Sequence, residues 1–285
     1  MSKMRKEEII YLAPQELKFS LKMKRALKRM IMIVINPFTT YDEISSSPDS
    51  IGPILLITIS ILLTLLDRYL LHLYVDYIRV EQKIMKTPFS TKMDDYFIVN
   101  FVFNGTLPLN KTTLTSSLNI LLNSLNYLLF ITLLSILSKI IIIFLLSSLL
   151  SMLLKGTTRG MFIASCYTLS ISLIQELIGI IFKMTCLSQV KSIVVIMPSD
   201  INQLQEETLV IRAISTYLSK IALYSKYFPL IGWFISLWYL VILVALFSSV
   251  SKLSLPKAIV STVITFIISS IMMTQLYGIL MSWQL

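Results

Sequence analysis

The sequence predicts an all-α fold: a polytopic membrane helix bundle with five transmembrane helices, an N-terminal amphipathic helix and small external loops. Composition is the first reason, because the 285 residues are 55% hydrophobic and 14% charged, with a mean hydropathy of +0.79. The length of the apolar runs is the second, since about 20 apolar residues already cross the hydrocarbon of a bilayer. The predicted spans are residues 52–75, 118–154, 160–182, 228–250 and 258–283.

The first 50 residues are predicted to form a cytoplasmic basic tail and linker, and residues 51–285 the membrane domain. Nine of the 25 Lys and Arg residues precede residue 30. The formal net charge of +10 therefore indicates a tail beside the membrane rather than a nucleic-acid surface. No secretory signal peptide is expected, because the apolar stretch at residues 30–35 is too short.

Within the tail, a helix is predicted over residues 15–35. Asn36-Pro37 ends it, because the residue before a proline avoids the helical region. One interpretation is a basic face that binds anionic lipid headgroups; the other is a positively charged flank of the first span. Residues 39–50 are predicted to be a polar linker. The basic face consists of Lys18, Lys22, Arg25 and Arg29.

The charges inside the predicted spans fall at one depth. The second span holds only Lys139 and the third only Glu176, and an antiparallel hairpin places both roughly 22–24 Å from their shared turn. Asp67 lies equally far from Gly52, where the first span begins. Because an isolated charge in a span costs about 2.5–3.5 kcal/mol, these side chains are expected to face polar partners inside the bundle. The predicted cluster is Asp67, Arg68, Lys139 and Glu176.

The alternative interpretation places the first-span pair, Asp67 and Arg68, in the headgroups. Lys139 would then extend its amine toward the membrane surface.

Residues 76–117 form the predicted first external loop. It carries two N-x-Thr sequons, at Asn104 and Asn110, which are candidate N-glycosylation sites. Residues 96–103 are rich in aromatic and β-branched side chains, and residues 192–196 in β-branched ones. These two segments predict either a short strand pair or two independent interfacial segments.

Residues 200–225 are predicted to form an amphipathic helix on the outer membrane surface, because apolar residues recur there at helical spacing. Orientation follows from the two short turns at residues 155–159 and 251–257. They carry four positive charges and no acidic residue, like the tail. Since such loops stay in the cytoplasm, we predict a cytoplasmic N-terminus and an extracytoplasmic C-terminus.

Three short stretches carry a family pattern. Residues 36–44, Asn-Pro-Phe-Thr-Thr-Tyr-Asp-Glu-Ile, are similar to an Asn-Pro-x-x-Thr-aromatic-x-x-Ile lead-in. Residues 49–53, Asp-Ser-Ile-Gly-Pro, are similar to an Asp-Leu-Tyr-Gly-Pro signature at the first span. Residues 166–170, Cys-Tyr-Thr-Leu-Ser, are comparable to a Gly-Tyr-Ser-Leu stretch without its glycine. The matching positions are Asn36, Pro37, Asp49, Gly52, Pro53 and Tyr167.

With these stretches the chain resembles the YIP family, the Ypt/Rab-interacting polytopic membrane proteins, and in particular its prokaryotic members. The sequence departs from the pattern at Ile174, near where a proline commonly falls. The resemblance implies five spans, a cytoplasmic N-terminus and the cell membrane of a prokaryote. In eukaryotic members it implies adaptor work with Rab-type GTPases. The competing interpretation is that Gly52-Pro53 only begins a helix.

The sequence lacks the residues that several classes of protein function require. A single histidine, His72, provides no metal cluster or catalytic triad, and seven glycines form no nucleotide-binding pattern. Cys166 and Cys186 lie near opposite ends of the third span, so no disulfide is expected. No span supplies the paired residues of a membrane protease. We therefore predict a protein that is not an enzyme and has no cofactor.

Two functions remain. The first is a non-enzymatic integral membrane adaptor or organiser that binds an unidentified protein partner on its cytoplasmic face. The second is a small transporter or permease subunit that uses the buried charged layer. With either function, we expect contacts with the bilayer and with anionic lipid headgroups at the N-terminal helix. We expect no nucleic-acid partner, and a homo-oligomer is compatible with both functions.

Overall fold

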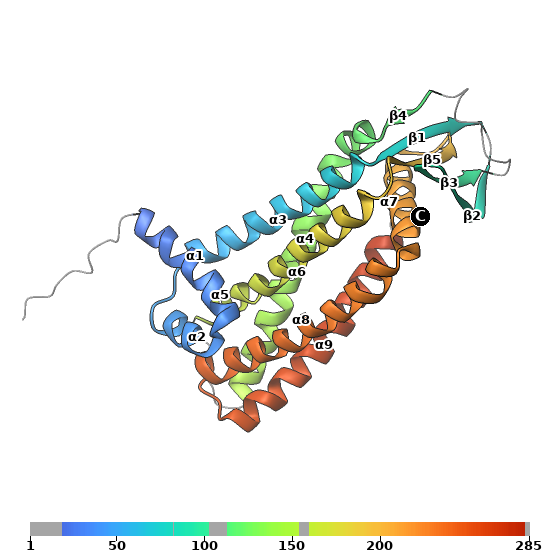
Figure 1. The fold of residues 1–285 in the computed structure, drawn as a ribbon. Helices are drawn as coiled ribbons and strands as arrows, with labels where there is room; N and C mark the ends of the chain where they lie inside the picture. The colour runs from blue at the N-terminus through green and yellow to red at the C-terminus, as the bar shows by residue number, and fades with distance from the viewer. Residues whose placement is uncertain (1–18, 82, 103–112, 154–159, 283–285) are drawn as a thin grey trace, which may run out of the picture.

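The computed structural model describes residues 19–81, 83–102, 113–153 and 160–282 as a helix bundle with a small sheet at one end (Figure 1). Five helical segments are long and apolar enough to cross a membrane, which confirms this part of the prediction. They are Ile51–His72, Leu118–Leu150, Met161–Leu187, Leu223–Val250 and Leu255–Met272.

The spans run alternately between two ends of the molecule. We call these the α1–α2 end and the sheet end, after the elements that lie there (Figure 1). The α1–α2 end carries α1 (Phe19–Ile35) and α2 (Pro37–Ser46). The spans comprise α3 (Ile51–His72), α4 (Leu118–Leu153), α5 (Met161–Tyr167), α6 (Leu169–Leu187), the π-helical turn η2 (Leu223–Tyr227), α8 (Phe228–Ala245), the π-helical turn η3 (Leu246–Val250) and α9 (Leu255–Ser282).

The segment predicted as a polar linker is largely helical, so that prediction is wrong. Pro37 lies in the first turn of α2, where its fixed φ suits a helix and its missing N–H has no partner to lose. The buried residues of α2 recur at the spacing of one helix face, and α2 packs against η3. They are Pro37, Thr40, Tyr41 and Ile44.

The sheet end corrects the all-α prediction. The segments predicted to pair lie side by side as β3 (Tyr96–Val102) and β5 (Ser192–Pro198), in parallel with Tyr96 opposite Ser192. They belong to a five-stranded sheet of order β2-β3-β5-β1-β4. The other strands are β1 (Val75–Val80), β2 (Ile84–Met93) and β4 (Thr115–Ser116).

The first span is shorter than predicted, because α3 ends at His72 and Val75 already begins β1. Val75 and Tyr77 are buried in the sheet core rather than in a bilayer span. β1 then pairs with the central strand β5 in parallel, with Val75 opposite Ile193.

The predicted helix at residues 200–225 exists as α7 (Gln203–Lys220), but its apolar face packs on the sheet rather than on a membrane surface. Asn202 and Gln205 form a reciprocal capping box that fixes its start. Val210 and Tyr217 are buried against the sheet core, where the Tyr217 ring lies 5.0 Å from that of Phe97. The sheet and α7 therefore pack together around one hydrophobic core at this end of the bundle.

Candidate functional site

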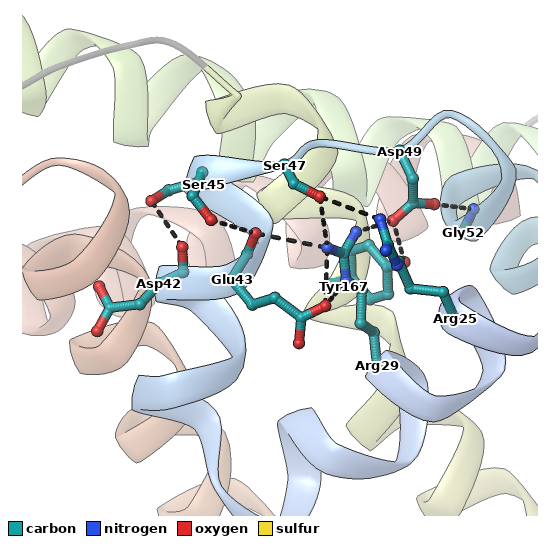
Figure 2. A network of polar contacts seen from close by, with 10 residues as sticks. Arg25, Arg29, Asp42, Glu43, Ser45, Ser47, Asp49, Gly52 and Tyr167 are labelled. Carbon is teal, nitrogen blue, oxygen red and sulfur yellow. Dashed lines mark hydrogen bonds and ion pairs between the residues drawn. The ribbon is translucent and has the colours of Figure 1, made fainter. Parts of the chain in front are cut away.

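At the α1–α2 end, a buried arginine joins three parts of the chain. Arg29 lies on the buried stripe of α1 with Ala26 and Ile33, and only 1% of its surface is exposed. Its Nη1 donates to Asp49 Oδ2 at 2.5 Å and its Nε to Glu43 Oε1 at 3.1 Å. Figure 2 shows the guanidinium enclosed by these acceptors. A buried charge is tolerated only when it is paired and hydrogen-bonded, as here.

The third nitrogen of the guanidinium, Nη2, also has polar partners. Nη2 donates to Ser47 Oγ at 3.1 Å and lies 3.0 Å from Glu43 Oε1. Burial lowers the pKa of Arg29, but the bonds to Asp49 and Glu43 outweigh this and leave the pKa raised. Arg29 therefore remains a cation across the physiological pH range.

Asp49 is the second centre of this network. Its Oδ1 accepts the Gly52 backbone N–H at 2.6 Å, in the first turn of α3, where carboxylates are favoured. Its Oδ2 accepts the Tyr167 hydroxyl at 2.9 Å as well as Arg29. One carboxylate thus connects α1, the start of α3 and the end of α5 (Figure 2). We call Arg29, Glu43, Ser47, Asp49, Gly52 and Tyr167 the Arg29 clamp.

Gly52 is required here by close approach. A Cβ at this position would overlap the Tyr167 hydroxyl oxygen and Cζ. Tyr167 is itself fully buried. Asp49, Gly52 and Tyr167, which carried the family resemblance from distant parts of the sequence, therefore meet in one contact.

The other motif residues lie outside the clamp. Asn36 lies at the break between α1 and α2, where its carbonyl accepts the Thr40 hydroxyl at 2.8 Å. Pro37 begins α2, and Pro53 is buried in the first turn of α3. These three positions shape helix ends, as their sequence suggested.

The residues of the predicted basic face differ in exposure. Arg29 does not belong to an exposed face, because it points into the clamp. Lys22 and Arg25 are exposed, and Arg25 Nη1 donates to Ser47 Oγ at 3.4 Å. Lys18 lies outside the described residues, as do the candidate glycosylation sites Asn104 and Asn110.

A second polar site lies inside the bundle, between α3, α4 and α6. It is a cavity of about 450 Å³, which we call the charged cavity. All four residues of the predicted cluster line it, together with a fifth charged residue that the sequence analysis missed. The charged lining residues are Asp67, Arg68, Lys139, Glu176 and Lys183.

The missed residue is Lys183, whose Nζ lies 2.6 Å from Asp67 Oδ2. The third span was ended at residue 182, whereas α6 continues to Leu187. Lys183 follows Glu176 by seven residues, so the two lie on the same face of the helix. That spacing was the signal that could have found it.

The rest of the charged cavity is incompletely paired. Lys139 Nζ donates to Ser172 Oγ at 3.2 Å and attracts Glu176 electrostatically. No described protein group donates to Asp67 Oδ1 or Glu176 Oε2, although both atoms are buried. Arg68 has no ion pair among the described residues. Three cations face two carboxylates, which leaves one excess positive charge.

Lys139 also lies where cavities meet. It lines two smaller ones, of about 200 and 90 Å³, and Tyr239 on α8 lines both. The larger of these reaches Phe266 on α9. Lys139 therefore lies between the charged cavity and the α8–α9 side of the bundle.

The only histidine, His72, joins the bundle to the sheet end. Its Nε2 lies 3.0 Å from Glu207 Oε2, and both side chains are buried. Its Nδ1 lies 2.8 Å from Ser117 Oγ, which itself donates to the His72 carbonyl at 3.1 Å. Because the serine proton goes to the carbonyl, Nδ1 carries a hydrogen. This contact connects the end of α3 with α4 and α7.

Among the described residues, no group of three or more His, Cys, Asp or Glu side chains is placed to hold a metal ion. Comparisons with models of known protein families, with curated proteins and with solved structures gave no match.

Proposed function

We propose that the protein is a non-enzymatic integral membrane adaptor or organiser, which presents α1 and α2 as a rigid platform to a protein partner. The observation that carries this proposal is the Arg29 clamp. Because Arg29 is buried and bonded to α2, to the following loop and, through Asp49, to α3 and α5, the platform cannot move independently of the membrane domain. A docking surface of fixed geometry lowers the entropic cost of binding.

Further contacts attach the platform to α8 and η3. The Trp238 indole donates to the Val34 carbonyl at 2.8 Å, and the Ser249 hydroxyl donates to the Phe38 carbonyl at 3.1 Å. These bonds connect both α1 and α2 to the continuous α8–η3 segment.

The face of α1 that points away from the clamp is exposed and mixed in character. Leu27 and Ile31 are exposed there at 42% and 62%, and their spacing of four residues places them on one side of the helix. Lys24 and Lys28 lie beside them and are also exposed. An apolar stripe edged by lysines is suited to a membrane surface with anionic lipids, while α2 stays available to a partner.

We place this platform in the cytoplasm, at the cell membrane of a prokaryote. The basic tail and the positively charged short turns at residues 155–159 and 251–257 support this orientation. The resemblance to prokaryotic YIP proteins supports the compartment.

Photo-crosslinking in native membranes tests the adaptor role. A photoreactive residue is placed at Asp42, which is exposed on α2, and a matched one at Leu62, which is exposed on α3 within the span. We expect a soluble protein to be captured from Asp42 and only lipid or membrane protein from Leu62.

The same capture is repeated with Asp49→Asn, which removes a charge of the clamp, and with Lys252→Gln, which changes an exposed lysine outside the clamp whose partner Asp42 the photoreactive residue already replaces. Capture should fall with Asp49→Asn and persist with Lys252→Gln. If folded Asp49→Asn captures the same protein equally well, a rigid platform is not required for partner binding.

A second candidate function is a small transporter or permease subunit, and the charged cavity favours it. Charged residues inside spans often belong to substrate or proton pathways. Glu176→Gln should then abolish uptake of a substrate into vesicles while the protein still assembles. Loss of assembly together with uptake would instead give Glu176 a structural role.

A further inference from the structure

We propose that the charged cavity is a binding site for a small amine-bearing anion: a ligand with a phosphate or carboxylate at one end and an ammonium at the other. Such a site is independent of the adaptor role. Failure to capture a partner at α2 would leave it standing.

The first argument is that the protein leaves acceptors unused inside an apolar bundle. Asp67 Oδ1 and Glu176 Oε2 are buried and receive no hydrogen bond from any residue that the structure describes. A buried charged oxygen without a donor is strongly unfavourable, so these atoms point to a ligand that donates. An ammonium offers three donors and the complementary charge.

The second argument is the excess of positive charge. Lys183 forms an ion pair with Asp67, and Lys139 donates a hydrogen bond to Ser172. Arg68, which also lines the cavity, has no ion pair in the described part of the chain. A guanidinium binds carboxylate and phosphate through two parallel hydrogen bonds. Arg68 therefore provides the part of the site that binds the phosphate or carboxylate of the ligand, and Lys139, whose hydrogen bond goes to the neutral Ser172 hydroxyl, adds a second cation.

The third argument is space. A volume of about 450 Å³ lies within the range of small-molecule sites in proteins. Thr64, Thr132 and Ser172 also line it. A hydroxyl offers one donor and two acceptor lone pairs, although the Thr64 proton already goes to the Ser60 carbonyl at 3.0 Å. A ligand with a single charge would use either the unfilled acceptors or the excess cation, whereas an amine-bearing anion uses both.

Two sources could supply this chemistry: a free solute or the headgroup of an aminophospholipid. Titration calorimetry of the full chain in nanodiscs of phosphatidylglycerol alone addresses the solute. The amine-bearing probes are O-phosphoethanolamine and L-aspartate. The single-group controls are inorganic phosphate and ethanolamine. Native mass spectrometry of nanodiscs containing equal phosphatidylethanolamine and phosphatidylglycerol addresses the lipid.

We expect one amine-bearing probe, or retained phosphatidylethanolamine, to bind at least about tenfold more tightly than either single-group control or than phosphatidylglycerol. Glu176→Gln and Arg68→Gln should each weaken that binding about tenfold or more. Lys92→Gln, which changes an exposed lysine of the sheet, should leave it unchanged.

The comparison of probes on the unaltered protein decides the question even if a variant does not fold. Equal binding of phosphate and the amine-bearing probes would reduce the site to a general anion site and overturn the proposal. So would the absence of binding by every probe and by phosphatidylethanolamine, since the cavity would then be a hydrated part of the bundle only.

Discussion

The Arg29 clamp and the charged cavity use the same kinds of side chain and differ in how far those side chains satisfy one another. In the clamp, a guanidinium that is 1% exposed meets two carboxylates and a serine hydroxyl. In the cavity, five charged groups surround about 450 Å³, and Asp67–Lys183 is the only pair within 4.0 Å among them.

The difference separates a structural role from a binding role. A network whose members are all partnered gains specificity of packing and has no place for a ligand. A network with buried acceptors left over keeps an energetic cost that a ligand can remove. Four experiments test this contrast, and the largest effect is expected in the clamp.

Asp49→Ala should have the largest effect on stability. It leaves the buried Arg29 with Glu43 as its only carboxylate partner in the clamp and removes the acceptor of the Tyr167 hydroxyl. Breaking a buried ion pair from one side costs about 3–5 kcal/mol. Denaturant unfolding in detergent measures the loss. Asp42→Ala, which removes an exposed pair with Lys252, should cost only about 0–1 kcal/mol. Equal losses in the two variants would show that the clamp does not stabilise the fold.

Gly52→Ala should have the next largest effect, about 1–3 kcal/mol, because its Cβ overlaps the Tyr167 hydroxyl. Tyr167→Phe removes that oxygen, so the double variant should recover part of the loss. The coupling is measured as a double-mutant cycle of unfolding free energies. Additive effects would mean that the two residues do not contact each other.

Glu176→Gln should change stability by less than about 1 kcal/mol. Within the described part of the chain, no group donates to Glu176 Oε2, and Lys139 keeps its bond to Ser172. Unfolding in the same detergent gives the comparison with the clamp. A loss as large as that of Asp49→Ala would make the cavity a structural ion-pair network instead.

The smallest effect concerns pH. The folded pKa of Arg29 is raised, so its stabilising contribution is complete below the unfolded pKa and is lost only as pH rises through the higher folded pKa. Arg29 should therefore add no pH dependence between about pH 7 and 10. In Arg29→Lys, the ammonium cannot reach all three acceptors, and the ordinary pKa of lysine is about 10.4. Its remaining contribution should therefore be lost as pH rises above about 10, where the arginine still contributes fully. Parallel unfolding curves at several pH values measure the difference.

The spans were predictable from the sequence because apolar length alone determines whether a helix can cross a bilayer. The depth of Lys139 and Glu176 also followed from counting residues along a hairpin. The sequence does not predict Lys183 inside the bundle, because a charged residue usually marks the end of a span, whereas Lys183 lies within α6 and pairs with Asp67 of α3. The seven-residue spacing from Glu176 indicates which helix face carries Lys183, but nothing local identifies its partner on another helix.

The clamp was predictable only in part. The resemblance singled out Asp49, Gly52 and Tyr167, but nothing local showed that Tyr167 occupies the space beside Gly52. Arg29 fitted a basic face by spacing, and only tertiary packing turns it inward. Strand β1 could not be predicted from the sequence either, because Val75 continues an apolar run and the strand is defined by its pairing with β5.

The most direct test of the contrast measures stability and ligand binding together in Asp49→Ala and Glu176→Gln. The amine-bearing ligand found with the unaltered protein serves as the probe. We predict that Asp49→Ala loses stability and, where still folded, binds that ligand normally, while Glu176→Gln keeps its stability and loses binding by about tenfold or more. If Glu176→Gln instead loses stability and retains binding, the cavity is structural and the distinction between the two sites is wrong.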